Sequence, residues 1–230
     1  VLQVPATLYE YPQMLRNNLD LFYNLSSTAE DHKKTEIYNE QMQRASVKTE
    51  FSSIEDYLAS LKIIITIFKN DVSLVQRMAQ MTQKTNQFNL TTKRYSEIEI
   101  ENMVLSPTID VFAFSVKDKY GDSGATGLCI VDIDNQNVFI DTFLMSCRVI
   151  GRNIEYVFMD YIVCSLIDST TTNISSIYKS TFKNRQVEKF YDDCSFKMIN
   201  SNKIVKKYNL NTNKYKHKNI KYIKVIINEH

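Results

Sequence analysis

The chain has 230 residues, of which 43% are hydrophobic and 23% charged, and such a composition is typical of folded rather than disordered proteins. Only 4 Gly and 3 Pro are present, which excludes a collagen-like structure and leaves little room for a long linker. The most apolar run, residues 63–68, is too short to cross a bilayer, and no secretory signal is visible. We therefore expect a cytoplasmic protein that does not associate with membranes.

Charge is distributed unevenly along the chain. The net charge is +2, but residues 195–230 hold nine lysines and one acid, a net of +8, whereas the residues before them hold 19 basic and 25 acidic side chains. A basic tail can meet an acidic partner such as nucleic acid or a carrier protein; alternatively, the lysines decorate solvent-facing strand positions. The tail lacks interspersed Arg and Gly, so we expect no nucleic-acid binding.

The cysteines predict neither disulfides nor a metal site. Cys129, Cys147, Cys164 and Cys194 are widely spaced and form no C-x-x-C pair, and the chain has 3 His. Dispersed thiols without an export signal favour a reducing compartment. We expect no bound metal, and free cysteines at all four positions.

Helical patterns dominate residues 1–61. Apolar side chains at helical spacing between residues 15 and 23 predict a first helix. A capping pattern that begins at Ser26 or Ser27 and includes Glu30 predicts a second, mostly polar helix that ends near residue 48. Ser53, which precedes two acids, predicts a third short helix that ends at residue 61.

The pattern changes at residue 62. Apolar and β-branched runs predict strands at residues 63–68, 109–116, 126–133, 138–144, 174–178, 196–199 and 222–227. Helices are predicted after Asn70 or Asp71 and over residues 96–105, 152–167 and 185–193. This order predicts an α+β fold with one βαβ crossover in its second half. We expect a helical segment over residues 1–61 and one domain over residues 62–230.

A glycine-containing turn joins a predicted strand to a predicted helix. Gly lets backbone N–H groups approach an anion, and the helix N-terminus adds partial positive charge; the simpler alternative is a tight turn. The pattern Arg148-x-x-Gly151-x-Asn153 resembles the R/Q-x-x-G-x-G/A signature of the GNAT acetyltransferase family, with Asn153 in place of the last small residue. The resemblance implies a site for CoA or phosphopantetheine at Arg148, Val149, Ile150, Gly151, Arg152 and Asn153.

A second segment resembles another GNAT signature, N-x-x-A-x-x-x-Y-x-x-x-G-F. It reads Asn184-x-x-Val187-x-x-Phe190-Tyr191-x-x-x-Ser195-Phe196. The resemblance implies that Tyr191 protonates the departing thiolate of the coenzyme and that Asn184 belongs to the coenzyme site; the alternative for Tyr191 is packing along one helix face. Both signatures stand in the expected order, which implies a GNAT-like domain over residues 62–230.

Three further blocks are similar to the FkbH-like proteins. Residues 79–95 read AQMTQKTNQFNLTTKRY, residues 118–122 read DKYGD, and residues 144–152 read LMSCRVIGR. The resemblance extends across the chain and is weaker before Ser52. FkbH-like proteins pair an N-terminal HAD-type phosphatase domain with a C-terminal GNAT-like domain. They load a glyceryl unit from a bisphosphorylated glycerate onto an acyl carrier protein, for polyketide precursors such as methoxymalonyl units.

The phosphatase signature of that family, a D-x-D-x-T/V loop, is missing. Residues 131–136 read VDIDNQ and imitate it without the final Thr or Val, and we interpret Asp132 and Asp134 as hairpin residues. We therefore expect the chain to be the C-terminal part of a longer protein, with a HAD domain as a partner and no phosphatase activity of its own.

The long block is rich in amide, hydroxyl and cationic side chains that can hydrogen-bond to a polyhydroxylated or anionic acyl group. The predicted substrate-binding residues are Thr85, Asn86, Gln87, Asn89, Thr91, Thr92, Arg94 and Tyr95. Alternatively, these side chains cap neighbouring helices in an ordinary loop.

Cys147 stands where the strand gives way to the helix. Helix N-termini favour thiolates, so Cys147 is a candidate to hold an acyl group as a thioester; the alternative is a structural or ligand-lining cysteine, because no His is nearby in sequence. Asp141 and Asp122 are candidate bases.

The sequence thus predicts an acyltransferase-like domain of an FkbH-type enzyme, which loads a glyceryl unit onto an acyl carrier protein with Tyr191 as the acid. Two alternatives stay open. The domain could be a catalytically silent module that docks the carrier protein, or an ordinary acetyl-CoA-dependent N-acetyltransferase.

Overall fold

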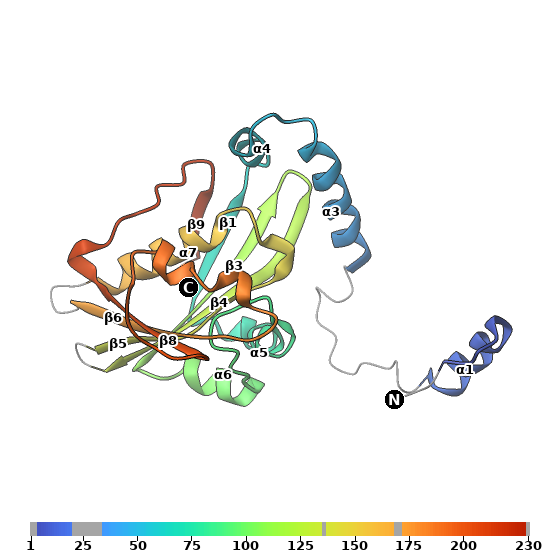
Figure 1. Ribbon diagram of the computed structural model, residues 1–230, viewed down its shortest axis with the longest axis horizontal. Helices are drawn as coiled ribbons and strands as arrows, with labels where there is room; N and C mark the ends of the chain where they lie inside the picture. Colours follow the sequence, from blue (N-terminus) through green and yellow to red (C-terminus); the bar gives the residue numbers. More distant parts are fainter. Residues whose placement is uncertain (1–3, 20–33, 135–136, 168–171, 229–230) are drawn as a thin grey trace. The chain divides into compact units, whose positions relative to one another are not determined.

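The computed structural model describes residues 4–19, 34–134, 137–167 and 172–228 (Figure 1). It divides into two compact units, Val1–Lys34 and Thr35–His230. The first unit contains a 3₁₀ turn, Leu8–Glu10, and the helix α1, Tyr11–Asn17, with Pro12 in its first turn, where a missing N–H costs nothing. The predicted cap from Ser26 to Glu30 lies outside the described residues.

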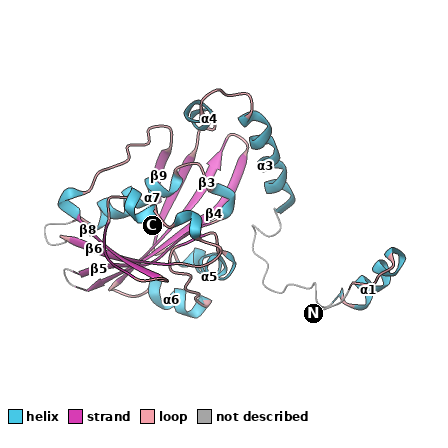
Figure 2. Cartoon of the chain, in the orientation of Figure 1, coloured by secondary structure: helices cyan, strands magenta, loops and turns pink. Residues whose placement is uncertain are grey.

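The second unit is a mixed sheet with helices on both faces (Figures 1 and 2). Its α-helices are α3 (Lys34–Lys48), α4 (Ile54–Ser60), α5 (Val75–Lys84), α6 (Glu97–Val104), α7 (Ile154–Leu166) and α8 (Phe190–Asp193). Its strands are β1 (Ile64–Lys69), β2 (Phe88–Asn89), β3 (Ile109–Asp118), β4 (Gly121–Asp134), β5 (Asn137–Met145), β6 (Asn173–Lys179), β7 (Lys197–Ser201), β8 (Val205–Asn211) and β9 (Lys224–Asn228).

The strands are ordered β7-β8-β6-β5-β4-β3-β1-β9, and β2 pairs with β5. Neighbours are antiparallel except for two parallel pairs, β1 with β9 and β5 with β6. The helix α7 connects β5 to β6, which gives the predicted βαβ crossover. The α+β prediction is confirmed, and Asp132 and Asp134 lie on β4 in the β4–β5 hairpin as expected.

Each face of the sheet has its own apolar core. On one face, α5 and α6 cover residues such as Ala113, Leu128 and Leu144. On the other face, α7 packs on a larger cluster in which the rings of Phe114 and Phe158 lie 4.6 Å apart. β5 is therefore covered on both faces. Its register in the sheet is fixed, because a shift would expose large side chains that are now buried.

Local sequence signals explain where several helices begin. The Ser53 hydroxyl accepts a hydrogen bond from the Asp56 N–H at the start of α4. Asp71 caps the 3₁₀ turn Val72–Leu74 before α5, and Ser96 and Glu99 form a complete capping box at α6. These caps satisfy N–H groups that a helix end leaves unpaired, and the corresponding predictions are confirmed.

The structure differs from the prediction most clearly in three elements. β8 lies in a segment that looked like a polar loop; its buried Tyr208 and Leu210 alternate with more exposed polar residues, the period expected of a strand. The predicted helix over residues 185–193 is split into the 3₁₀ turn Arg185–Val187 and the short α8. The two-residue strand β2 carried no periodic signal at all.

Residues 35–61 belong to the sheet unit, so the division falls at Lys34 and earlier than the predicted boundary at residue 61. Tyr57, Leu58 and Leu61 are part of the larger core, which ties α4 to the sheet. No helix among the described residues is long and apolar enough to cross a membrane.

Candidate functional site

The centre of the sheet contains a gap that a segment of the chain itself fills. The parallel strands β5 and β6 pair only from Asn137↔Asn173 to Ile140↔Ser176. Beyond that point Phe88 and Asn89 pair with Met145 and Leu144 of β5. Leu90 then bridges both strands, because its N–H donates to the Phe143 carbonyl at 3.1 Å and its carbonyl accepts from the Lys179 N–H at 2.7 Å.

Asn184 fastens this segment in place. Its side-chain Nδ2 donates to the carbonyls of Asn89 (2.8 Å) and Lys179 (2.9 Å), and its Oδ1 accepts from the Thr181 N–H (2.7 Å). The Tyr178 hydroxyl donates to the same oxygen at 3.2 Å. Asn184 is fully buried and its hydrogen-bonding capacity is used within the chain, so it does not face a coenzyme as the sequence implied.

Most predicted substrate-binding side chains bind the chain itself. Asn89 Oδ1 accepts from the Thr92 N–H at 2.8 Å and Nδ2 donates to the Thr85 carbonyl at 3.2 Å. Arg94 donates to the Thr82 carbonyl and to Asn86 Oδ1, both at 2.6 Å, and to the Gln83 carbonyl. Thr85 and Thr91 are buried, whereas Gln87 is exposed. These contacts match the alternative in which the block is a self-capping loop.

Asp141 joins the long block to β5 at a β-bulge. The register shifts between Ile130 and Val131, which pair with Thr142 and Ile140, so Asp141 is the extra residue. Its carboxylate accepts from the Tyr95 hydroxyl at 2.6 Å and the Thr142 hydroxyl at 3.0 Å, and it pairs with the Lys93 ammonium. The structure therefore brings a predicted base and a predicted substrate-binding residue together. Burial and this carboxylate raise the pKa of Tyr95.

Distance along the strand separates Asp141 from Cys147. Four residue steps lie between Asp141 and Met145, the last residue of β5, and at the usual rise of a strand they span roughly 13 Å. Cys147 lies beyond that end. Asp141 therefore does not accept a proton from the Cys147 thiol directly.

Tyr191, the predicted general acid, is buried inside the core. It is 1% exposed and packs against Phe196 and Tyr208, whose rings are 5.0 and 5.3 Å from its own. Burial raises the pKa of Tyr191 well above its usual value, an effect that the Ser176 hydroxyl opposes. A hydroxyl sealed in this way cannot deliver a proton to a thiolate at the surface, so the structure favours the packing role.

Replacing Tyr191 with phenylalanine is expected to leave acyl transfer unchanged and to alter the free energy of unfolding by less than about 1 kcal/mol. The reason is that its buried hydroxyl makes no hydrogen bond of normal geometry to the described residues. Urea denaturation and the transfer rate measure both effects. Tyr208→Phe is the matched control, because that hydroxyl donates to Asp192 at 3.0 Å and its loss should cost about 1 kcal/mol. A large loss of transfer in Tyr191→Phe alone would restore the acid role.

Cys147 is the first residue of a single 3₁₀ turn, Cys147–Val149. It is exposed, as is Cys164, whereas Cys129 and Cys194 are buried, and burial raises the pKa of both buried thiols well above the usual value. The predicted helix begins only at Ile154, so Cys147 does not stand at the mouth of α7. Its accessibility, rather than a helix dipole, makes it the candidate nucleophile.

The turn that was predicted to hold a pyrophosphate borders a surface cavity of about 160 Å³. Ile150 and Gly151 line this cavity, together with Phe88, Glu155, Tyr156, Gln186, Val187, Lys189, Phe190 and Asp193. Gly151 has a φ of +81° and space beside its Cα, which fits the predicted close approach of a ligand. Val149 is buried, however, and the Asn153 amide donates to the Tyr222 hydroxyl at 2.7 Å.

The charges around this cavity do not suit a diphosphate. The lining residues include two acids, Glu155 and Asp193, and one cation, Lys189. Glu155 is 8% exposed and its Oε2 has no hydrogen-bond partner among the described residues. Bringing a diphosphate beside an unpaired, desolvated carboxylate is unfavourable, because like charges repel strongly at low dielectric. An uncharged ligand fits the cavity better.

Burial raises the pKa of Glu155 to about 6, against about 4.3 in an unfolded chain. Between these two values the folded chain holds a proton that the unfolded chain has lost. The free energy of unfolding is therefore highest below pH 4, where Glu155 is neutral in both states, and it falls as the pH rises through 6 and Glu155 ionises inside the fold. Glu155→Gln, which stays neutral, is therefore expected to match the wild type at pH 4 and to be about 2 kcal/mol more stable at pH 7.5.

Urea denaturation of both proteins across this pH range tests the prediction. The control is Glu101→Gln, because the Glu101 side chain is exposed to water in the folded chain. Equal stability of Glu155→Gln and wild type at pH 7.5 would mean that the carboxylate is not desolvated.

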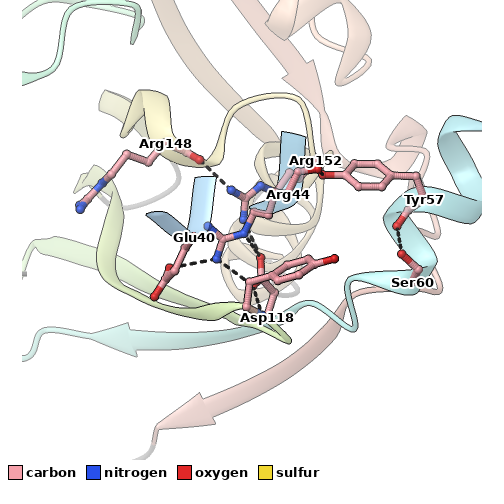
Figure 3. Close-up of polar contacts among 8 residues, drawn as sticks. Glu40, Arg44, Tyr57, Ser60, Asp118, Arg148 and Arg152 are labelled. Atoms are coloured by element: carbon pink, nitrogen blue, oxygen red, sulfur yellow. Dashed lines mark hydrogen bonds and ion pairs between the residues drawn. The ribbon is translucent and has the colours of Figure 1, made fainter. Parts of the chain in front are cut away.

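Arg152 and Asp118 form a buried ion cluster with the helix α3 (Figure 3). Arg44 donates to both carboxylate oxygens of Asp118 at 2.8 Å, and Arg152 donates to the same carboxylate at 3.0 Å and to the Arg148 carbonyl at 2.8 Å. Glu40 pairs with Arg44 at 3.1 Å. Arg152 therefore points into the protein and is not available to bind a coenzyme, whereas the Arg148 guanidinium points away from the cluster (Figure 3).

The cluster balances its own charges. Burial opposes the charge on Arg44, but hydrogen bonds and attraction to Asp118 outweigh it and raise its pKa. Burial and the neighbouring Arg44 lower the pKa of Arg152, against the attraction of Asp118. Sequence reasoning missed this cluster because Arg44 lies in a helix whose polar composition predicted exposure; the signal was Asp118, the first residue of the DKYGD block.

No family model matches the chain, and no curated protein is significantly similar in sequence. Among solved structures, the ribosomal-protein-S18-alanine N-acetyltransferase of Escherichia coli matches 64% of this chain and 94% of its own, with 8% identity and a TM-score of 0.51. Arabidopsis thaliana NAA60, in complex with a bisubstrate analogue, matches 63% and 95% (14% identity, TM-score 0.50). The PaiA N-acetyltransferase of Thermoplasma acidophilum, in complex with coenzyme A, matches 64% and 98% (11% identity, TM-score 0.50). The chain has a GNAT-like fold.

Proposed function

We propose that this domain acts in acyl transfer of the FkbH type. In this proposal, Cys147 receives a phosphoglyceryl group from a bisphosphorylated glycerate and passes it to the phosphopantetheine thiol of an acyl carrier protein; hydrolysis in the HAD-type partner domain then removes the remaining phosphate and leaves the glyceryl unit. The observation that supports it most directly is that Cys147, which follows the end of β5, has an exposed thiol.

Contacts between the blocks support this reading. Phe88 and Asn89 of the first block pair with Met145 and Leu144 of the third block. Asp118 of the second block accepts a hydrogen bond from Arg152 of the third block. Blocks far apart in the sequence thus contact one another in the fold.

The chemistry requires two thioester-forming steps. In the first, the Cys147 thiolate attacks the C1 carbonyl carbon of the acyl phosphate, a C–S bond forms, the C–O bond to phosphate breaks and inorganic phosphate leaves with the electron pair. In the second, the carrier thiolate attacks the same carbon and Cys147 departs as a thiolate. The uncharged pantetheine arm suits the cavity beside Gly151 better than a diphosphate does, because two of the residues that line the cavity, Glu155 and Asp193, are acidic.

A test uses the purified chain and 1,3-bisphosphoglycerate. We expect the intact mass to rise by one phosphoglyceryl group, and peptide mapping to place that group on the segment that contains Cys147. Labelling confined to another cysteine, or no labelling under conditions in which the protein is folded, would contradict the proposal.

A second candidate function is a catalytically silent docking module. The sealed Tyr191 hydroxyl and the filled gap between β5 and β6 favour it. It predicts that the chain binds an acyl carrier protein and never carries an acyl group itself, the HAD-type partner domain doing the chemistry. Binding without labelling of Cys147 would select this candidate.

A further inference from the structure

Two parallel strands that separate leave backbone N–H and C=O groups unpaired along their facing edges. Such groups must find partners when they are buried, and an extended chain with amide groups can supply them by adding as a strand. β5 and β6 separate after Ile140 and Ser176, so residues 141–145 of β5 face a gap of this kind. Pantetheine is itself an extended chain with two amide groups, and this gap is the edge that it would pair with.

The gap is occupied by Phe88, Asn89 and Leu90. Asn89 and Leu90 are 0% exposed and Phe88 is 3% exposed. Backbone hydrogen bonds from Leu90 reach both β5 and β6, and the Phe88 ring lies 5.3 Å from the Phe190 ring and 6.0 Å from the Phe143 ring. The segment is therefore an integral strand of the sheet, paired on both sides and covered by the core.

We propose that Phe88–Leu90 is a built-in strand that closes the gap between β5 and β6, so that no pantetheine arm, whether of coenzyme A or of a carrier protein, enters the sheet there. Asn184 is the positioning residue of this device, because it holds both the Asn89 and the Lys179 carbonyls. The inference concerns where a pantetheine arm can lie, and its test does not require any acyl transfer.

The carrier arm then meets the domain from outside. Phe88 lines the cavity beside Gly151 while it pairs with β5, so this residue forms the wall between the cavity and the interior of the sheet. A thiol that enters the cavity therefore meets Phe88 before it could reach the interior of the sheet.

Amide hydrogen exchange measured by NMR tests the closed gap. The N–H groups of Leu90 and Lys179 donate across the two junctions, so we expect both to be as strongly protected as the amides of the central β3–β4 pairing. Addition of coenzyme A to about 1 mM, a concentration that would detect weak binding, should leave their exchange unchanged. Faster exchange of either amide on addition of coenzyme A, or absence of protection in the free protein, would overturn the inference.

Two variants sharpen the test. Asn184→Ala should speed exchange at Leu90 and Lys179 by at least about tenfold through local opening, and Asn173→Ala, an exposed asparagine at the other end of β6, should not. If Asn184→Ala fails to fold, the wild-type titration still decides. Coenzyme A that binds while both amides stay protected lies outside the gap and agrees with the inference. Failure to label Cys147 would count against the proposed function alone.

Discussion

Replacing Cys147 with alanine is expected to lower the rate of glyceryl loading onto a carrier protein by at least about 10³-fold, because removing a covalent nucleophile eliminates both thioester-forming steps. The rate is measured in the intact protein as the appearance of glyceryl carrier protein from the bisphosphorylated glycerate. Folding should be unaffected, since Cys147 is exposed and lies outside both apolar cores.

Cys164→Ala is the matched control for this substitution. Cys164 is the other exposed cysteine; its sulfur lies 3.8 Å from His217 Nδ1, and partial burial raises its pKa. We expect this variant to load at the wild-type rate. Equal loading by Cys147→Ala and wild type would remove Cys147 from the mechanism and leave the docking role.

Asp118→Ala should be the most destabilising of the substitutions considered. It leaves Arg44 and Arg152 facing each other without their shared counter-charge, and the Asp118 side chain is completely buried. Breaking a buried ion cluster by removing one partner costs about 3–5 kcal/mol. For a unit of this size that corresponds to a fall of roughly 10 °C in Tm, which calorimetry and urea denaturation can both measure.

Asp132→Ala provides the comparison for Asp118→Ala. Asp132 is an exposed aspartate on the neighbouring strand β4, and its replacement should change the free energy of unfolding by less than about 0.5 kcal/mol. A loss below about 1 kcal/mol in Asp118→Ala would show that water reaches the two guanidinium groups and screens them.

Much of the fold could be predicted because its signals are local. Capping residues such as Ser53 and Ser96 predict where helices begin, and β-branched runs such as residues 63–68 predict strands. β2 could not be predicted, because two residues give no period and their pairing with β5 depends on where β5 and β6 diverge. α7 begins after the predicted position because Asn153 adopts a left-handed conformation, with a φ of 61°.

The candidate site was less predictable, because a motif specifies which residues are present and not which way they point. Arg152 satisfies the spacing of a phosphate-binding turn, yet its guanidinium turns inward to Asp118. Asn184 and Tyr191 likewise match a coenzyme signature. In the structure, however, Asn184 hydrogen-bonds to the Asn89 and Lys179 carbonyls, and Tyr191 packs in the core. Cys147 is exposed as a nucleophile must be, but it lies in a separate 3₁₀ turn and not at the start of the helix that the sequence predicted.

The bridge from Arg44 through Asp118 to Arg152 makes α3 a mechanical part of the sheet unit. A shortened chain that begins after Lys48 would lack Arg44. Asp118 would then keep its ion pair with Arg152 only, and the hairpin between β3 and β4 would lose its contact with α3. Arg152 also donates a hydrogen bond to the Arg148 carbonyl. A displacement of α3 would therefore act, through the guanidinium groups of Arg44 and Arg152, on the loop that contains Gly151. Boundaries for expressing this domain should accordingly be drawn before residue 35 and not at the first strand.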